Sequence, residues 1–306
     1  MAGAALKLAG AALTSPFGKF HAIEGTYDST IALWDGGIQI AGGVPANGSV
    51  VSNLVRDRAA AVTGLSAANC DFTMANDTAN GFVAAERTAK GGLHIASTQA
   101  GAQDRSASVG FLYPQAFADW LLANTDAGAD YAIVSTVWAQ RTRVQGASNT
   151  AVQPLSWIAA AAGATSNFFY HSQGGLPFPN SAAAPGFVVG QALPAGVMAS
   201  AAMQVVSAQG WTGAKPSALN QAGRLAMLAN VGACAGWGSL NYNKAPSFII
   251  YRAQLDLVDL SDAAGSDRNA KAATMIAALN AQLARDFGVD GRFAGDTFTP
   301  PETLKA

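Results

Sequence analysis

Residues 248–262, FIIYRAQLDLVDLSD, alternate between apolar and polar side chains, and a helical pattern follows at 269–288, NAKAATMIAALNAQLARDFG. Apolar residues occupy the odd positions from Ile249 to Leu257, and three polar residues fall between them: Arg252, Gln254 and Asp256. Successive strand side chains point to opposite faces, so the stretch predicts a strand with one buried face and one solvated or partnered face. This favours an antiparallel sheet, because strands of parallel sheets are apolar on both faces.

Turn-forming clusters recur along the rest of the chain, for example WDGG at 34–37 and AGGVPANGS at 41–49. Clusters of Gly, Pro and Asn between short apolar stretches are typical of an all-β sandwich or barrel. The strands that this pattern predicts are 31–34, 81–85, 131–143, 167–171, 186–190, 196–206 and 247–260.

The strand at 131–143 differs from the others because both of its faces are apolar or small. One face carries Ile133, Ser135, Val137 and Ala139, and the other carries Ala132, Val134, Thr136 and Trp138. We expect a central strand that is covered on both sides. A short helix should precede it, beginning after Pro114 and ending at Asn124.

The C-terminal helix has a clear apolar stripe, made of Ala272, Met275, Ile276, Leu279 and Leu283. A stripe with this spacing predicts packing against a core, and a subunit contact is the alternative. Phe287 extends the stripe, and we expect Gly288 to end the helix in the left-handed conformation.

Composition limits the function. Charged residues make up 12% of the 306 residues and the net charge is −1, against roughly 25% charged residues in an average soluble domain. A basic stripe for nucleic acid is absent from the sequence, so nucleic-acid binding is not expected. No apolar run has the ~20 residues that a membrane helix needs, so membrane insertion is not expected either.

The low charge has two compatible explanations. A surface covered by neighbouring subunits can do without the charges that keep monomers apart, which favours assembly. The other explanation is an ordinary Ala- and Gly-rich protein from a GC-rich genome. The apolar stretch MAGAALKLAGAALTSPFG at 1–18 lacks a basic start and is interrupted by Lys7. It therefore suggests an arm that packs on a partner more than a cleaved signal.

Metal and cofactor motifs are not found. The histidines His21, His94 and His171 lie far apart in the sequence, and the two cysteines, Cys70 and Cys234, form no CxxC pair. Neither a nucleophile elbow, a dinucleotide fingerprint nor a P-loop occurs. We therefore expect no catalytic residue, no metal and no cofactor.

Glycoside hydrolysis requires two carboxyl groups that flank the scissile bond. The chain has only three glutamates, Glu24, Glu86 and Glu302, and none lies in a strand beside a second acid. Asp256 and Asp259 share a strand but should point to opposite faces, since they are three positions apart. A glycan-degrading enzyme is therefore the weakest of the hypotheses.

Three tryptophans, Trp34, Trp211 and Trp237, lie next to glycine-rich turns. A ring in such a position can be exposed to stack on a sugar or to contact a partner. Alternatively, these rings fill the ends of the core, because Trp buries a large apolar area. They are the candidate ligand or partner contacts.

Several segments carry a resemblance to known proteins. The strand DYAIVSTVWAQ (130–140) resembles the central strand of concanavalin A-like, laminin G-type jelly-roll sandwiches, and residues 236–262 with 272–280 look like their closing strand and trailing helix. The end, GRFAGDTFTPPETL (291–304), is similar to tails of predicted tailed-bacteriophage virion proteins. The sequence lacks a recognisable calcium and sugar loop, unlike the lectins, and lacks the paired glutamates of the glucanases. The resemblance implies the sandwich and a virion role, and carries no site residues across.

The sequence therefore predicts a mainly β protein, an antiparallel β-sandwich of the concanavalin A-like jelly-roll type, with a short internal helix and a C-terminal helix. The expected parts are an N-terminal arm (1–25), the sandwich (26–262) and a C-terminal helix and tail packed on it (263–306). The expected function is that of a non-enzymatic virion structural protein of the tail, baseplate or fibre, which assembles with its own copies and with other virion proteins. A carbohydrate-binding module that contacts a host-surface glycan is the alternative.

Overall fold

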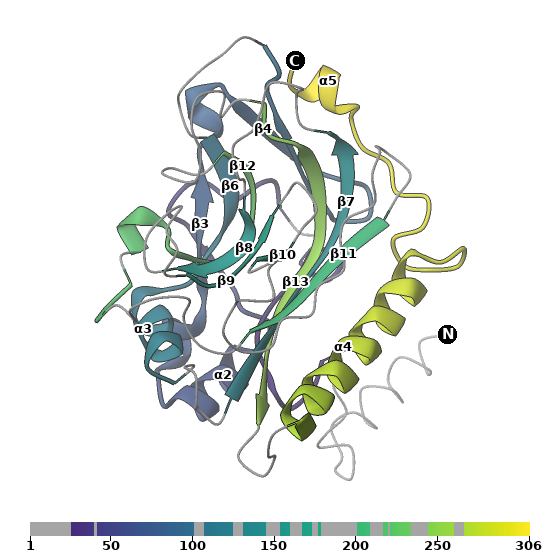
Figure 1. The fold of residues 1–306 in the computed structure, drawn as a ribbon. Coiled ribbons are helices and arrows are strands. Elements are labelled where there is room, and N and C mark those ends of the chain that lie inside the picture. The colour runs from purple at the N-terminus through teal and green to yellow at the C-terminus, as the bar shows by residue number, and fades with distance from the viewer. Residues whose placement is uncertain are drawn as a thin grey trace, which may run out of the picture.

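The structure is a computed structural model that is mostly β, with two antiparallel sheets and a few helices (Figure 1). It describes residues 26–39, 42–100, 107–124, 131–144, 154–159, 167–172, 177–178, 201–208, 217–219, 221–233, 244–259 and 266–306. The predicted strand at 186–190 and the predicted arm at 1–25 lie outside these ranges.

Sheet A contains β1 (Thr30–Asp35), β4 (Val83–Arg87), β5 (Leu93–Ser97), β7 (Tyr131–Arg143), β11 (Ala201–Ala208) and β13 (Ser247–Asp259). Its order is β11-β7-β13-β5-β4. The 13-residue β13 pairs β7 along one side, and along the other it pairs first β5 and then β1. The opening stretch is therefore the central element of this sheet.

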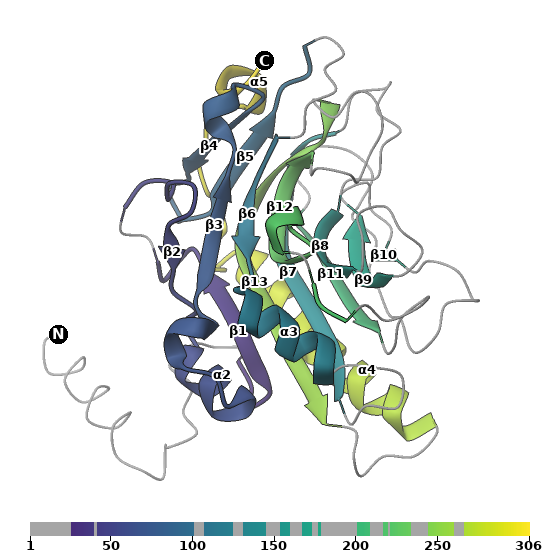
Figure 2. The same cartoon turned by 90° about the vertical axis from the view of Figure 1, so that its left-hand side faces the viewer.

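Sheet B contains β2 (Val50–Val51), β3 (Phe72–Asn76), β6 (Ala107–Leu112), β8 (Pro154–Ala159), β9 (Asn167–Ser172), β10 (Pro177–Phe178) and β12 (Ala226–Ala233), in the order β10-β9-β8-β12-β6-β3-β2. The inner faces of the two sheets share one core, to which β5, β6, β7 and β13 all contribute. Figure 2 shows sheet B across the view, from β2 and β3 on the left to β9 and β10 on the right, with β4 of sheet A on the same side as β2.

The described chain also contains three short 3-10 helices (Ala67–Cys70, Thr78–Asn80 and Gln221–Gly223) and four α-helices: α2 (Arg56–Thr63), α3 (Gln115–Asn124), α4 (Ser266–Phe287) and α5 (Pro301–Leu304). The predicted helix before β7 is confirmed as α3. The predicted C-terminal helix is confirmed as α4, which lies over the outer face of sheet A (Figure 1). Leu279 is fully buried there against Val134, Trp138 and Tyr251.

The two-faced prediction for β7 is confirmed, because Ile133 and Val137 face the inner core while Val134 and Trp138 face α4. For β13 the predicted assignment of side chains to the two faces of the strand is wrong over its first residues. Ile250 faces the inner core, whereas Ile249 and Tyr251 face α4.

The reason is a bulge, at which the register with β7 shifts between Ile250 and Arg252. A bulge inserts one residue into one strand, so side chains beyond it change face. Ala253, Leu255 and Leu257 lie beyond this bulge and face the inner core, as predicted.

The predicted end of α4 is also wrong in detail. The φ angle of Gly288 is not positive, so this residue does not adopt the left-handed conformation. The chain instead turns through Gly288 and Gly291, with the Gly291 amide donating to the Gly288 carbonyl at 2.8 Å. A Cβ at Gly291 would lie 2.3 Å from the carbonyl oxygens of Arg285 and Asp286, so the close approach at Gly291 requires glycine.

Candidate functional site

Trp34 lies at the wall of a cavity of about 300 Å³, the candidate functional site. Its lining comes from both sheets and from the segment after β1: Trp34, Ile38, Gln39, Gly43, Pro45, Val50, Val51, Arg87, Leu93 and Phe111. We call it the Trp34 cavity. A volume of roughly 300 Å³ is at the lower end of the range for small-molecule sites in proteins.

Trp34 lines this cavity but is only 2% exposed. Its ring centroid lies 4.6 Å from that of Phe111 on β6, so it packs between the sheets. This places Trp34 in the core, the second of the two placements expected from the sequence, although the cavity reaches it. Trp211 and Trp237 lie outside the described residues.

Arg87, the last residue of β4, is the cation of the cavity. Its Nη2 donates to the carbonyl oxygens of Gly36 at 3.0 Å and Gln39 at 2.7 Å, and its guanidinium carbon lies 5.3 Å from the Trp34 ring centroid. A Cβ at Gly36 would lie 2.2 Å from the Gly91 carbonyl oxygen, so only glycine allows the two turns to approach this closely. The turns therefore hold the guanidinium in place.

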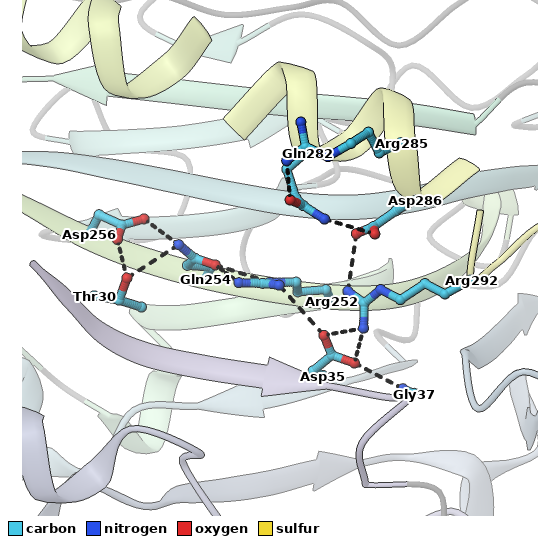
Figure 3. A network of polar contacts seen from close by, with 10 residues as sticks. All are labelled: Thr30, Asp35, Gly37, Arg252, Gln254, Asp256, Gln282, Arg285, Asp286 and Arg292. Atoms are coloured by element: carbon cyan, nitrogen blue, oxygen red, sulfur yellow. Dashed lines mark hydrogen bonds and ion pairs between the residues drawn. The ribbon is translucent and has the colours of Figure 1, made fainter. Parts of the chain in front are cut away.

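A second polar region is the network that the α4-facing side of β13 forms (Figure 3). At one end, Thr30 donates to Asp256 at 2.5 Å and Gln254 donates to Asp256 at 2.8 Å. Arg252 then donates to Gln254 at 3.0 Å and lies 4.8 Å from the Trp138 ring centroid. The polar face of the opening stretch is therefore partnered inside the molecule.

The network continues from the sheet into the C-terminal segment. Asp35 accepts a hydrogen bond from Arg292 at 2.9 Å and forms an ion pair with Arg252 at 3.7 Å. Arg292 also binds Asp286 at 3.1 Å, and Gln282 donates to Asp286 at 2.9 Å (Figure 3). These contacts fix the end of α4 and the turn after it to β1 and β13.

Burial sets the protonation of this network. Burial raises the pKa of the Asp256 carboxyl to about 6, against the opposing effect of its hydrogen bonds from Thr30 and Gln254. Burial also lowers the pKa of Arg252 to about 10, although Asp35 opposes this shift. The arginine stays charged at neutral pH, whereas the Asp256 carboxyl titrates not far below it.

A third cluster lies around His94 on β5, which is fully buried. Its Nδ1 lies 3.0 Å from Glu86 Oε1 and its Nε2 lies 3.0 Å from Thr142 Oγ1. Glu86 also accepts hydrogen bonds from the Thr299 amide and hydroxyl, both at 2.7 Å. Phe298 packs edge-on against the imidazole at a centroid distance of 5.1 Å.

The protonation of this cluster follows from its contacts. Burial lowers the pKa of His94, with Glu86 opposing, so the ring is neutral at neutral pH. Burial alone would raise the pKa of Glu86, but the hydrogen bonds from His94 and Thr299 outweigh it and lower the pKa. An ionised Glu86 only accepts, so Nδ1 of His94 donates to it and Nε2 accepts from Thr142.

A hydroxyl, an imidazole and a carboxylate in a row are the parts of a hydrolase triad. A nucleophile must reach its substrate, however, and both Thr142 and His94 are 0% exposed. The row instead joins β4, β5 and β7 to the tail through Thr299. We therefore interpret the cluster as the anchor of the C-terminal tail.

Replacing Thr299 with Val should weaken this anchor. The variant loses the hydroxyl bond to Glu86 and keeps the amide bond, so we expect a loss of about 1 kcal/mol in unfolding free energy and a higher pKa for Glu86. Urea unfolding measures the first effect. Thr297→Val is the control, since Thr297 is exposed and its change should stay within about 0.5 kcal/mol; equal losses in both variants would contradict the anchor.

Of the residues gathered in these regions, sequence reasoning singled out Trp34, the polar positions of β13 and His94 without its partners. It missed Arg87, Asp35 and Arg292 because they are isolated charges with no motif around them. His21 lies outside the described residues. Within the described part of the chain, no group of three His, Cys, Asp or Glu side chains is placed to hold a metal ion, and no helix is long and apolar enough to cross a membrane.

Comparison of the chain with protein-family models, with curated proteins and with solved structures finds no match.

Proposed function

We propose that this protein is a non-enzymatic structural component of a bacteriophage virion, in the tail, baseplate or fibre, which assembles with its own copies and with other virion proteins. The concanavalin A-like form of the sandwich belongs to the same proposal. Both rest on the sequence resemblance, and the two antiparallel sheets are compatible with them.

The observation that carries the assembly role is the edge of sheet B. This sheet ends at the two-residue strand β2, where Val50 is 73% exposed, and Ile38 of the adjacent turn is 47% exposed. Both side chains line the Trp34 cavity. An edge strand beside exposed apolar side chains is a surface on which another chain can pack.

The first test is the mass of the purified chain in solution, by size-exclusion chromatography with light scattering. We expect an oligomer, or association that increases with concentration. Replacing both Ile38 and Val50 with Gln should raise the dissociation constant at least tenfold, or about 1.4 kcal/mol, because less apolar area is buried on association. Val62→Gln is the control, since Val62 is 41% exposed but lies on α2.

A monomer at every concentration would contradict the assembly role. A glycan array probed with the same sample addresses the alternative, because a monomer that binds sugars would favour a carbohydrate-binding module. Recovery of peptides of this chain from purified phage particles would test the virion role directly.

A further inference from the structure

Arg87 carries a positive charge that has no carboxylate partner in the described chain. Its Nη2 is occupied by two backbone carbonyls, and no ion pair joins Arg87 to any described acid. Asp35, whose charge acts on Arg87, is paired to Arg252 and Arg292 instead. The guanidinium therefore lacks a full counter-charge.

An anion would complete this arrangement. A partly buried cation loses hydration, and two carbonyls with one aromatic face replace only part of that loss. The Nε of Arg87 and the Oε1 of Gln39 are buried with no hydrogen-bond partner, and neither atom has surface that a ligand could reach. Nη1 of Arg87 donates to no described residue and keeps accessible surface. It is therefore the donor that the cavity leaves open to a ligand.

The other walls are apolar. Leu93 and Phe111 are fully buried behind the cavity, and Val50 and Ile38 lie at its exposed rim. A cavity of about 300 Å³ admits a small molecule but not a folded element. Its complement is therefore a compact apolar group that bears one negative charge.

We propose that the Trp34 cavity binds a small organic acid, whose carboxylate contacts Arg87 and whose apolar part packs against Ile38 and Val50. A charge-assisted hydrogen bond to a guanidinium is about twice as strong as a neutral one. The carboxylate thus supplies orientation, and the apolar walls supply most of the buried area. This site goes beyond the assembly role, although its rim includes Val50 and Ile38.

The test uses fluorine NMR on the full chain, with 4-fluorophenylacetate and its neutral amide as matched probes. We expect the acid to bind and the amide to bind at least tenfold more weakly. Arg87→Gln should weaken binding of the acid at least tenfold, and Arg87→Lys should weaken it less, because the charge remains. Arg56→Gln is the control, since Arg56 is on α2 and does not line the cavity.

Equal binding of acid and amide, or unchanged binding by Arg87→Gln, would overturn the proposal, as would no binding of the acid at millimolar concentration. If Arg87→Gln does not fold, the acid and amide pair on the unaltered chain decides. If the acid binds only to the Ile38→Gln, Val50→Gln double variant, the proposal is also overturned. In that case an acidic group of a neighbouring copy fills the cavity of the unaltered protein.

The assembly role is judged by mass on the same samples. A monomer that binds the acid keeps this proposal and removes the assembly role. An oligomer keeps the assembly role and removes this proposal if neither the unaltered chain nor the Ile38→Gln, Val50→Gln variant binds the acid.

Discussion

Replacing Asp35 with Asn should destabilise the protein by about 3 to 5 kcal/mol, the usual effect of removing one partner of a buried ion pair. Asp35 and Arg252 are both 0% exposed. The amide keeps the shape of the carboxyl but removes the negative charge next to Arg252 and Arg292. Urea unfolding at pH 7 measures the loss, which should appear as a lower midpoint.

Two further variants show whether charge is the cause. Asp57→Asn removes an acid whose side chain is 91% exposed, and it should change the unfolding free energy by less than about 0.5 kcal/mol. Arg252→Met in the Asp35→Asn background removes the unpaired cation and should recover part of the loss. Two results would contradict an ionic link between α4 and sheet A. One is an Asp35→Asn variant as stable as the Asp57→Asn control. The other is an Arg252→Met substitution that lowers the unfolding free energy of the Asp35→Asn variant further instead of restoring part of it.

The sequence predicts only part of this ionic link between Asp35, Arg252 and Arg292. Alternation over 248–262 identified the strand and its polar residues, because side-chain direction repeats every two residues. What covers the polar face was open between solvent and a neighbouring subunit, and the structure shows α4 and the turn after it. Arg252 and Arg292 meet at Asp35 through contacts between distant parts of the chain, and spacing along the sequence does not encode such contacts.

The bulge in β13 was missed for a related reason. Tyr251 fits an alternating apolar pattern as well as its neighbours do, so nothing local marks the extra residue. Strands β6 and β12 were missed because they are rich in Ala, Gly and Ser, which give no alternation. Their pairing depends on backbone approach: a Cβ at Gly110 would lie 2.2 Å from the Ala229 carbonyl oxygen.

The candidate site shows the same division. Trp34 was found because a large ring beside a glycine turn is conspicuous in a sequence. Arg87 was not, since one arginine near the end of a short strand has many ordinary explanations. Its place in the cavity follows from contacts in three dimensions with Gly36, Gln39 and Trp34.

The second large effect concerns pH, and Asp256 is its source. In the folded protein burial raises the pKa of this carboxyl to about 6, while its ordinary value is 3.8. Between these two pH values the folded state holds a proton that the unfolded chain has released. Stability conferred by this group is therefore fully present below about pH 4 and is lost as the pH rises through about 6.

The size of the effect follows from the difference between the two pKa values, since one unit corresponds to about 1.4 kcal/mol. The loss between pH 4 and pH 7 is therefore about 3 kcal/mol. Asp256→Asn cannot titrate, and its amide can keep both neighbours, because the Thr30 hydroxyl can accept as well as donate. The variant should gain about 3 kcal/mol relative to the unaltered protein between pH 4 and pH 7.

Urea unfolding of both proteins at pH 4, 5, 6 and 7 tests this, with the difference in unfolding free energy as the readout. Other ionisable groups, such as Glu86 and His94, are present in both proteins, so their contributions cancel in the difference. Asp57→Asn again serves as the control, because it removes an exposed acid on α2. A flat difference for Asp256→Asn would mean that the carboxyl is ionised at low cost in the folded state. Arg252 and the hydrogen bonds of Thr30 and Gln254 would then outweigh the burial of the charge.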